Sequence, residues 1–246
     1  MGKMELFGKT DIGLRRTNNE DVFYVDLQRG FCLVADGMGG AAAGELASSI
    51  FAESARKTFS SVMNADKLSA TELVKSAFQL ANKNILEHIK EFPHHKGMGC
   101  TAELLAVSDG GLVLGHIGDS RTYRFRNGNL SRLTRDHSLV QEQVDKGLIT
   151  ARQAKKHPMK NVILKAVGIS GSFEIDIISL KSQENDLYLM CSDGLTDMVD
   201  DEQILHVLAC DANIEQKTQM LIDLAKTAGG LDNITLVLCR MLPHPE

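Results

Sequence analysis

The sequence predicts an α+β fold in which long helices cover sheets of antiparallel strands. Short apolar runs of strand length follow one another with turn signals between them, at Asp109-Gly110-Gly111 and Asn127-Gly128. Turns of this length favour hairpins over the crossover connections of parallel sheets. Segments with helical periodicity flank these runs, so we expect helices packed against the sheets.

Strands are expected where short runs are mostly apolar and end at turn residues. In chain order these runs are residues 22–25, 31–35, 102–107, 112–117, 122–125, 173–180, 187–191 and 234–241. All of them fall short of the roughly 20 apolar residues that a membrane-spanning helix needs. We therefore expect no membrane association.

Three long helices are expected, over residues 44–63, over residues 69–92 and from residue 213 to the glycine pair at 229–230. The second has the clearest start, because Ser69-x-x-Glu72 is a capping box and apolar residues then recur every four positions. Residues 138–170 differ from the rest in their charge, in paired helix-like stretches and in a proline. We interpret them as an insertion that lies over the sheet.

Composition narrows the class of protein. The chain has 246 residues, 43% of them apolar, and no linker or repeat, which indicates one domain over residues 1–246. A net charge of −5 gives no electrostatic basis for binding nucleic acid, since that affinity depends on cationic contacts to phosphates. Five cysteines without a Cys-x-x-Cys pair indicate buried thiols in a reducing compartment.

The most informative pattern is an apolar strand that ends in an aspartate next to a glycine or serine. It occurs at Asp36, Asp119 and Asp193, and Asp232 opens the last strand. Strand ends on one rim of a sheet can bring such carboxylates together. Clustered aspartates repel one another unless cations lie between them, and oxygen ligands suit Mg²⁺ or Mn²⁺.

Each aspartate also has a simpler interpretation, because Asp-Gly is a common turn dipeptide. We assign only that role to Asp109, which lies in a plain hairpin. Arg16 likewise has two interpretations. Its guanidinium fork suits phosphate oxygens, and the nearby Glu20 and Asp21 could add metal ligands or hydrogen-bond acceptors. Alternatively, Arg16 could form a surface ion pair with these acidic side chains.

Nine motifs in order resemble the compact bacterial branch of the PPM family, the metal-dependent (type 2C) protein serine/threonine phosphatases. The motifs are Gly13-x-x-Arg16-x-Asn18-Asn19-Glu20-Asp21, Val34-Ala35-Asp36-Gly37-Met38-Gly39-Gly40, Ala43-Gly44-Glu45-x-Ala47-Ser48, Gly97-Met98-Gly99-Cys100-Thr101, Gly118-Asp119-Ser120-Arg121, Leu133-Thr134-Arg135-Asp136-His137-Ser138, His157-Pro158-x-x-Asn161, Cys191-Ser192-Asp193-Gly194-Leu195-Thr196 and Asp232-Asn233-Ile234-Thr235. Any one of them is weak, but their order along nearly the whole chain makes an accident implausible.

The resemblance implies a four-layer α-β-β-α sandwich with a flap near residues 138–170, and two Mn²⁺ or Mg²⁺ ions with room for a third. It implies metal ligands at Asp21 (through water), Asp36 (bridging), the Gly37 carbonyl, Asp119, Asp193 and Asp232. The implied third ion would lie between Asp119 and Asp193. The implied catalytic residues are Arg16, which would hold the substrate phosphate, Asp36 and Asp193.

Three positions depart from the family. Met38 stands where eukaryotic relatives carry histidine, Ala41 where bacterial relatives often carry histidine, and Lys165 where arginine is common. The first two leave the protonation of the leaving group without an assigned side chain. We interpret His116 as a strand packing residue and His137 as structural.

The implied activity is one-step hydrolysis of phosphoserine and phosphothreonine in proteins by a metal-bridging water, with no Ser, Cys or His nucleophile. The implied setting is the bacterial cytoplasm, where a monomer would oppose a cognate Ser/Thr protein kinase. Two alternatives stay open: a catalytically silent phosphoprotein-binding regulatory domain on the same fold, and an enzyme that acts chiefly on small phosphoesters.

Overall fold

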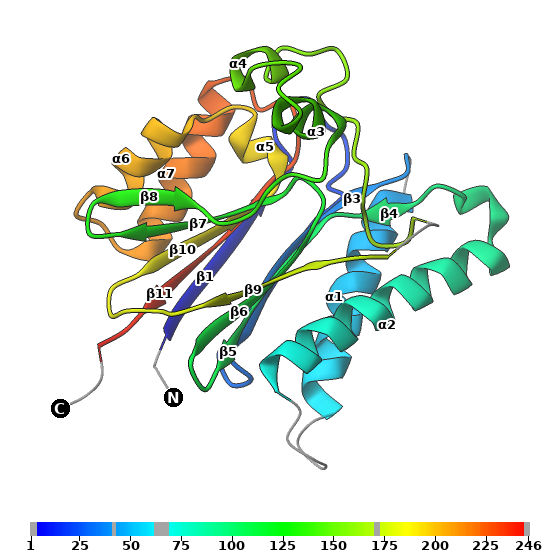
Figure 1. Cartoon of the computed structure of the whole chain (residues 1–246), viewed down its shortest axis with the longest axis horizontal. Coiled ribbons are helices and arrows are strands. Elements are labelled where there is room, and N and C mark those ends of the chain that lie inside the picture. The colour runs from blue at the N-terminus through cyan, green and yellow to red at the C-terminus, as the bar shows by residue number, and fades with distance from the viewer. Residues whose placement is uncertain (1–3, 41–42, 62–68, 170–172, 244–246) are drawn as a thin grey trace.

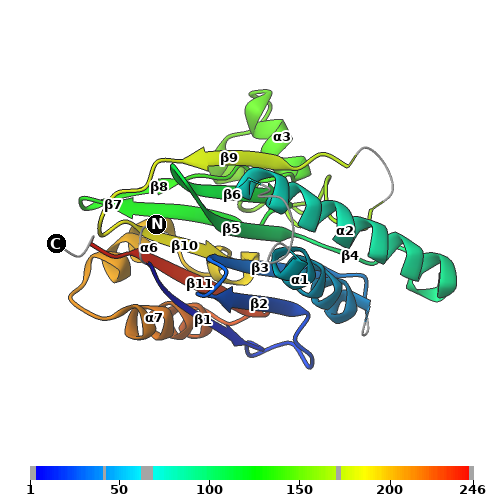
Figure 2. The ribbon, with the colours of Figure 1, turned by 90° about the horizontal axis from the view of Figure 1, so that it is seen from below.

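Two antiparallel sheets form the centre of the molecule, and helices cover the outer face of each (Figures 1 and 2). The structure is a computed structural model that describes residues 4–40, 43–61, 69–169 and 173–243. In order across the first sheet, the strands are β1 (Met4–Asp11), β11 (Ile234–Met241), β10 (Leu187–Cys191), β7 (Arg121–Arg126) and β8 (Asn129–Arg132). In the second they are β2 (Asp21–Asp26), β3 (Phe31–Met38), β5 (Ala102–Ser108), β6 (Gly111–Ile117) and β9 (Asp176–Leu180), and the short β4 (Gly99–Cys100) pairs with β3.

Both predicted hairpin turns join antiparallel neighbours. The turn at residues 109–110 connects β5 and β6, and Asn127-Gly128 connects β7 and β8. Asn127 and Gly128 have φ of 50° and 77°, the left-handed pair that a type I′ turn requires. The turn therefore carries the twist that antiparallel strands prefer, which explains why this dipeptide was informative.

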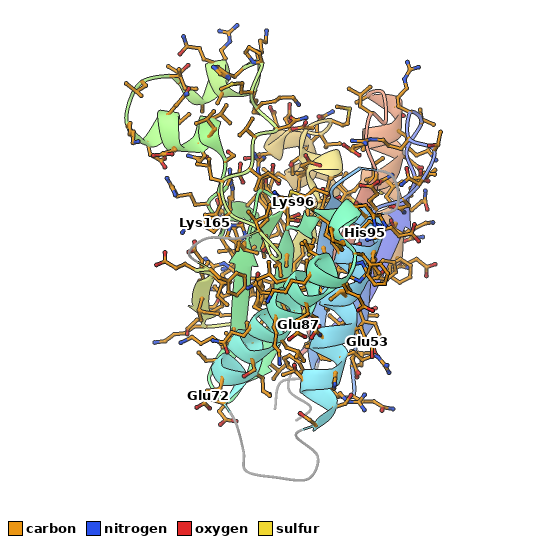
Figure 3. All side chains as sticks on the ribbon, turned by 90° about the vertical axis from the view of Figure 1, so that its right-hand side faces the viewer. Glu53, Glu72, Glu87, His95, Lys96 and Lys165 are labelled. Atoms are coloured by element: carbon orange, nitrogen blue, oxygen red, sulfur yellow. The ribbon has the colours of Figure 1, made fainter. Side chains whose placement is uncertain are left out.

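The helices form the two outer layers. Helices α1 (Ala43–Ser61) and α2 (Ala70–Glu91) lie on the second sheet, and α6 (Asp201–Ala209) and α7 (Ile214–Thr227) lie on the first (Figure 1). The predicted capping box at Ser69 is present in full. The predicted end of the first helix, at residue 63, lies outside the described residues. On the solvent side of α1 and α2, Figure 3 shows Glu53, Glu72 and Glu87 pointing away from the sheet.

Alternation along the strands creates three apolar cores. In β3, Phe31 and Leu33 face α1 and α2, whereas Cys32 between them faces the other sheet. In β11, Leu236 faces α6 and α7, and Val237 faces the second sheet. Both faces of these strands are buried, so their sequences appear as continuous apolar runs instead of alternating ones. The four-layer α-β-β-α sandwich is confirmed.

The segment at residues 138–169 lies over one end of the sheets, at the top of Figure 1. It contains two short helices, α3 (Leu139–Asp145) and α4 (Ala151–Ala154), each opened by a hydroxyl N-cap. Isolated bridges join Ser138 to Ile163 and Cys100 to Val167, and the second bridge connects the segment to β4. We call residues 138–169 the flap, and its helix-like stretches are confirmed.

Several elements were missed or misjudged in extent. Strand β1 was missed because its residues are half-buried throughout and include Gly8 and Lys9, and β8 because it is polar and partly exposed. Strand β9 begins at Asp176 and not at residue 173. Helix α6 is only nine residues long and was also missed. Among the described residues, no helix combines the length and apolar character needed to cross a bilayer.

Candidate metal centre

Five aspartates from both sheets meet at the end of the sandwich that the flap covers. They lie at the start of β2 (Asp21), near the end of β3 (Asp36), after β6 (Asp119), directly after β10 at the start of the short helix α5, Asp193–Thr196 (Asp193), and just before β11 (Asp232). Asp21 and Asp119 are buried, and the other three are half-buried, so the site is accessible from solvent on one side. The structure thus brings together all five carboxylates that the sequence predicted. We call this end of the sandwich the rim.

Hydrogen bonds fix the two aspartates on neighbouring strands. Asp21 is the register partner of Asp36, and its Oδ2 accepts a hydrogen bond of 2.7 Å from the Ser192 hydroxyl. The backbone of Asp36 is held by Thr101, whose N–H donates to the Asp36 carbonyl over 2.9 Å and whose hydroxyl accepts from the Asp36 N–H over 3.2 Å. The protein itself therefore fixes the Asp21 carboxylate and the Asp36 backbone.

The carboxylates raise one another's pKa values. Burial, followed by the negative charges of Asp21 and Asp193, raises the pKa of Asp36 well above its ordinary range. Burial also raises the pKa of Asp21 to about 7 and that of Asp193 to about 6. One oxygen of Asp119, Oδ1, is buried without a hydrogen-bond partner. A hard cation would satisfy this oxygen and offset the repulsion, so the residues present fit Mn²⁺ or Mg²⁺.

The spacing fits more than one ion. Within the part of the chain that the structure describes, the one group of three or more His, Cys, Asp or Glu side chains with ligand atoms all within 4.8 Å of one another is His116, His137 and Asp176. Among these described residues, no three of the five rim carboxylates have oxygens all within 4.8 Å of one another. Such spreading is expected for paired ions, which lie about 3.5–4 Å apart and share ligands.

Two glycines allow the backbone segments of the site to approach closely. A Cβ on Gly37 would lie 2.0 Å from the carbonyl oxygen of Gly44, and one on Gly194 would lie 1.9 Å from that of Asn233. Neither contact is possible for any other residue without moving the backbone. Gly37, whose carbonyl is a predicted ligand, therefore holds the end of β3 against the start of α1.

Arg16 points at the site, but its partner differs from the expected one. Its Nη2 donates to Oδ2 of Asp232 over 2.6 Å, and the side chain is 50% exposed. The sequence had suggested an ion pair with the neighbouring Glu20 or Asp21. Asp232 instead holds the guanidinium beside the carboxylates, with half of the side chain accessible to a ligand.

A cleft of about 400 Å³ extends from the rim beneath the flap. Asp119 and Asp193 line it at the metal centre. The rest is lined by residues of the flap, by α5, the start of α6 and the segment between them, and by Arg121, Arg132 and Asp136. Lys160 of the flap forms an ion pair across it with Asp197, which directly follows α5. This contact was not predicted, because nothing in sequence links two charges 37 positions apart.

A buried polar network beside the cleft corrects our interpretation of His116. This residue is not a simple packing residue: its Nδ1 pairs with the buried Glu103, and its Nε2 lies 2.9 Å from the carbonyl oxygen of Arg135. His137 stacks on it at 4.7 Å, accepts from the Gly118 N–H and reaches Asp176 at 3.3 Å, which agrees with a structural role. The missed signal was Glu103, a lone charge in an apolar strand.

The three departures from the family pattern supply no alternative acid. Met38 ends β3 and is half-buried, Lys165 pairs with Glu174 at 3.5 Å, and Ala41 lies outside the described residues. The methionine thioether cannot donate a proton. The residue that protonates the leaving oxygen thus has no assignment among these positions.

Known proteins with the same architecture are close in sequence. Residues 14–227 match the profile of the family described as Protein phosphatase 2C. Protein phosphatase PhpP of Streptococcus pneumoniae is 34% identical over 241 residues, covering 97% of this chain and 98% of that protein. Serine/threonine phosphatase stp of Listeria monocytogenes is 35% identical over 236 residues, covering 94% and 93%.

Solved structures agree. The Mycobacterium tuberculosis serine/threonine phosphatase PstP/Ppp superposes with a TM-score of 0.89 at 34% identity, covering 98% of this chain and 99% of that one. A catalytic domain of PstP in complex with two manganese ions superposes with a TM-score of 0.88 at 33% identity, with the same coverage. With the fold, the carboxylate rim and these matches taken together, the chain belongs to the protein phosphatase 2C family.

Proposed function

We propose that this chain hydrolyses phosphoserine and phosphothreonine in proteins, with Mn²⁺ or Mg²⁺ bound by the rim carboxylates. The observation that carries the proposal is the convergence of five aspartates, whose mutual repulsion bound cations would offset. The names of the relatives, which are serine/threonine phosphatases, support the substrate class. A catalytically silent regulatory domain is disfavoured because it would have no need to keep all five carboxylates.

Each rim residue has a role in this proposal. Asp36 would bridge two ions, and the Gly37 carbonyl would bind the first of them. Asp193 and Asp232 would bind the second, and Asp21 would act through water. Asp119, with its unpartnered oxygen, would share a third ion with Asp193.

Such ions supply a water nucleophile at neutral pH and positive charge for the phosphoryl oxygens. The side chains of the protein position the substrate phosphate and the metal ligands. Arg16 binds and orients the phosphate, and Asp232 holds the guanidinium in position. Water adds to phosphorus as the bond to the serine or threonine oxygen breaks, which leaves inorganic phosphate and the free hydroxyl. Ser192 keeps the Asp21 carboxylate directed at the site throughout.

The wider setting follows from the same resemblance. We infer that residues 1–246 form one catalytic domain, which acts as a monomer in a bacterial cytoplasm on proteins phosphorylated by a cognate Ser/Thr protein kinase. The relatives from Streptococcus and Listeria, which this chain covers over more than nine tenths of their length, support this setting. The charge of −5 supports the absence of nucleic-acid binding.

One experiment tests the activity. The purified chain is incubated with phosphoserine, phosphothreonine and phosphotyrosine peptides and with free phosphoserine, first with Mn²⁺ and then with excess EDTA. We expect phosphate release from the first two peptides that needs the metal. Release that EDTA leaves unchanged, or no release from any peptide, would refute the proposal, and release from free phosphoserine alone would favour a small-molecule phosphatase.

A further inference from the structure

Three apolar side chains are exposed at the rim, on the side where Arg16 lies. Ile12, Leu14 and Leu231 are 39%, 58% and 54% exposed. The first two belong to the loop between β1 and β2, and Leu231 belongs to the loop between α7 and β11. Leu14 stands two residues before Arg16, and Leu231 directly precedes Asp232. We call Ile12, Leu14 and Leu231 the rim patch.

The two loops are joined through their backbones. The Leu14 N–H donates to the Gly230 carbonyl over 2.7 Å, and the Asn233 side-chain amide donates to the Ile12 carbonyl over 3.0 Å. Gly13, at φ +79°, packs so closely that a Cβ there would lie 2.2 Å from the Asp232 carbonyl oxygen. The rim patch therefore stands on a fixed backbone, although its side chains are open to water.

Leu14 lies against the loop that carries Leu231. A Cβ on Gly230, the residue between Leu231 and Gly229, would lie 3.0 Å from Cγ of Leu14, so Leu14 covers that glycine. Large apolar side chains that gather on a fixed surface beside a polar site are typical of binding surfaces, because exposing them to water has no benefit for stability. A surface already held in place also loses little entropy when a ligand binds.

The position of the rim patch beside Arg16 indicates which ligand would bind there. Arg16 donates to Asp232, so a phosphate that the guanidinium holds lies next to the loop that carries Leu231. Successive residues of an extended peptide are separated by about 3.3–3.6 Å. A side chain within two residues of a phosphoserine or phosphothreonine that Arg16 holds can therefore reach the loop that carries Leu231. The cleft beneath the flap, where Lys160 and Asp197 meet, is charged instead.

We propose that the rim patch binds an apolar side chain of the substrate, located within two residues of the phosphorylated serine or threonine. This inference rests on the proposed phosphatase activity. It makes Leu14 and Leu231 determinants of substrate choice, which act on KM for peptides and do not take part in the reaction. Free phosphoserine, which has no neighbouring residues, cannot use the rim patch.

The test compares phosphothreonine peptides that differ at one position. A parent peptide carries alanine at the two residues on each side of phosphothreonine, and four others carry a single leucine at one of these positions. Wild-type chain with Mn²⁺ should prefer at least one leucine peptide by about three- to tenfold in kcat/KM, which is the range expected from partial burial of a leucine side chain. The preference should lie in KM.

The double variant Leu14→Gln/Leu231→Gln keeps the side-chain size and removes the apolar surface. It should lose the preference while its hydrolysis of the alanine peptide and of free phosphoserine stays within about twofold of wild type. Leu27→Gln is the matched control, because Leu27 is 57% exposed and lies in the turn at the opposite end of β2 and β3. This control should keep the preference.

The outcomes separate the two proposals. If the wild-type chain releases no phosphate from any substrate, the proposed function is wrong. If it hydrolyses all five peptides equally well, or if the double variant keeps the leucine preference as Leu27→Gln does, the function stands and the role of the rim patch is refuted. Equal loss of activity toward peptides and free phosphoserine in the double variant would also refute it, since the leucines would then support the metal centre.

Discussion

Asp21 and Asp36 are directly opposed register partners on β2 and β3, so two carboxylates of the same sheet enter the site side by side. Like charges at opposed positions of an antiparallel pair destabilise a sheet. The fold keeps this pair where Ser192 donates to one carboxylate and Thr101 fixes the backbone of the other. Such an arrangement is unfavourable for folding and is explained by what it can bind.

Replacing the bridging carboxylate should abolish turnover. Asp36→Asn keeps the shape of the side chain and removes its charge, so we expect kcat/KM to fall by more than about 100-fold, because even outer partners of metal ligands are worth 10–100-fold. Metal-free Asp36→Asn should be at least as stable as wild type, because one repelling charge is gone. Phosphate release and urea unfolding in EDTA measure the two effects.

Asp109→Asn is the control for this substitution. Asp109 lies in an exposed Asp-Gly turn between β5 and β6, which has no role at the rim. Its activity should match wild type. Turnover of Asp36→Asn close to that of the control would remove Asp36 from the metal centre.

The buried pair of Glu103 and His116 should contribute strongly to stability. Both side chains are fully buried, and Thr122 also donates to Glu103. Glu103→Ala leaves His116 and Thr122 without their partner, so the free energy of unfolding should fall by about 3–5 kcal/mol. Urea denaturation provides the measurement, and Glu53→Ala, which breaks an exposed ion pair with Arg56, should cost less than about 1 kcal/mol. Equal costs for the two variants would contradict the role of burial.

His137 should make stability depend on pH. Burial, followed by the positive charge of His116, lowers the pKa of His137 to about 4 from an ordinary value of 6.5. Between these values the unfolded chain binds more protons than the folded chain at this position. The contribution of His137 is therefore complete above pH 6.5 and is lost as the pH falls toward 4.

The variant His137→Gln isolates this effect, because glutamine can still accept the hydrogen bond from the Gly118 N–H. The difference in unfolding free energy between wild type and His137→Gln should shrink from pH 7 to pH 5, in EDTA for both proteins. Subtraction cancels the titration of the rim carboxylates. Parallel pH profiles would show that His137 titrates as it does in the unfolded chain.

The ion pair between Lys160 and Asp197 should hold the flap closed over the cleft. Lys160→Ala and Asp197→Ala should each speed protease cleavage within the flap by up to about fivefold, since partly exposed ion pairs contribute less than about 1 kcal/mol. The double variant should be no faster than either single variant, because both remove the same contact. Lys83→Ala, which breaks an exposed pair with Glu87 on α2, should leave flap cleavage unchanged. Additive effects of the two flap substitutions would exclude a shared contact.

Local sequence was sufficient to predict an element where a single strand or a capping side chain determines it. Strands β3 and β11 were predicted because both of their faces are buried, and α2 because Ser69 and Glu72 cap it. Strands β1 and β8 were missed because half-buried or polar residues give no such pattern. The aspartates at the rim were predicted because each adjoins an apolar strand, and the ends of those strands share one side of the fold.

Contacts between distant positions were beyond reach of the sequence. Arg16 pairs with Asp232, Lys160 with Asp197 and His137 with Asp176, and none of these pairs has a local signature. Their geometry depends on how the flap and the two sheets come together. The exposure of Leu14 could not be predicted either, since an apolar residue near a predicted site is as compatible with a core position as with a surface.

The three apolar cores also limit the reaction of the cysteine thiols with oxidants. Four of the cysteines, namely Cys32, Cys100, Cys191 and Cys239, are enclosed within the three apolar cores. Burial raises the pKa of the Cys239 thiol to about 12 and raises those of the other three as well. Peroxide attacks thiolates, so these positions offer it little to oxidise. A hydrolase whose chemistry depends on oxygen ligands and whose sulfur is kept protonated can keep working under conditions that inactivate enzymes with a cysteine nucleophile.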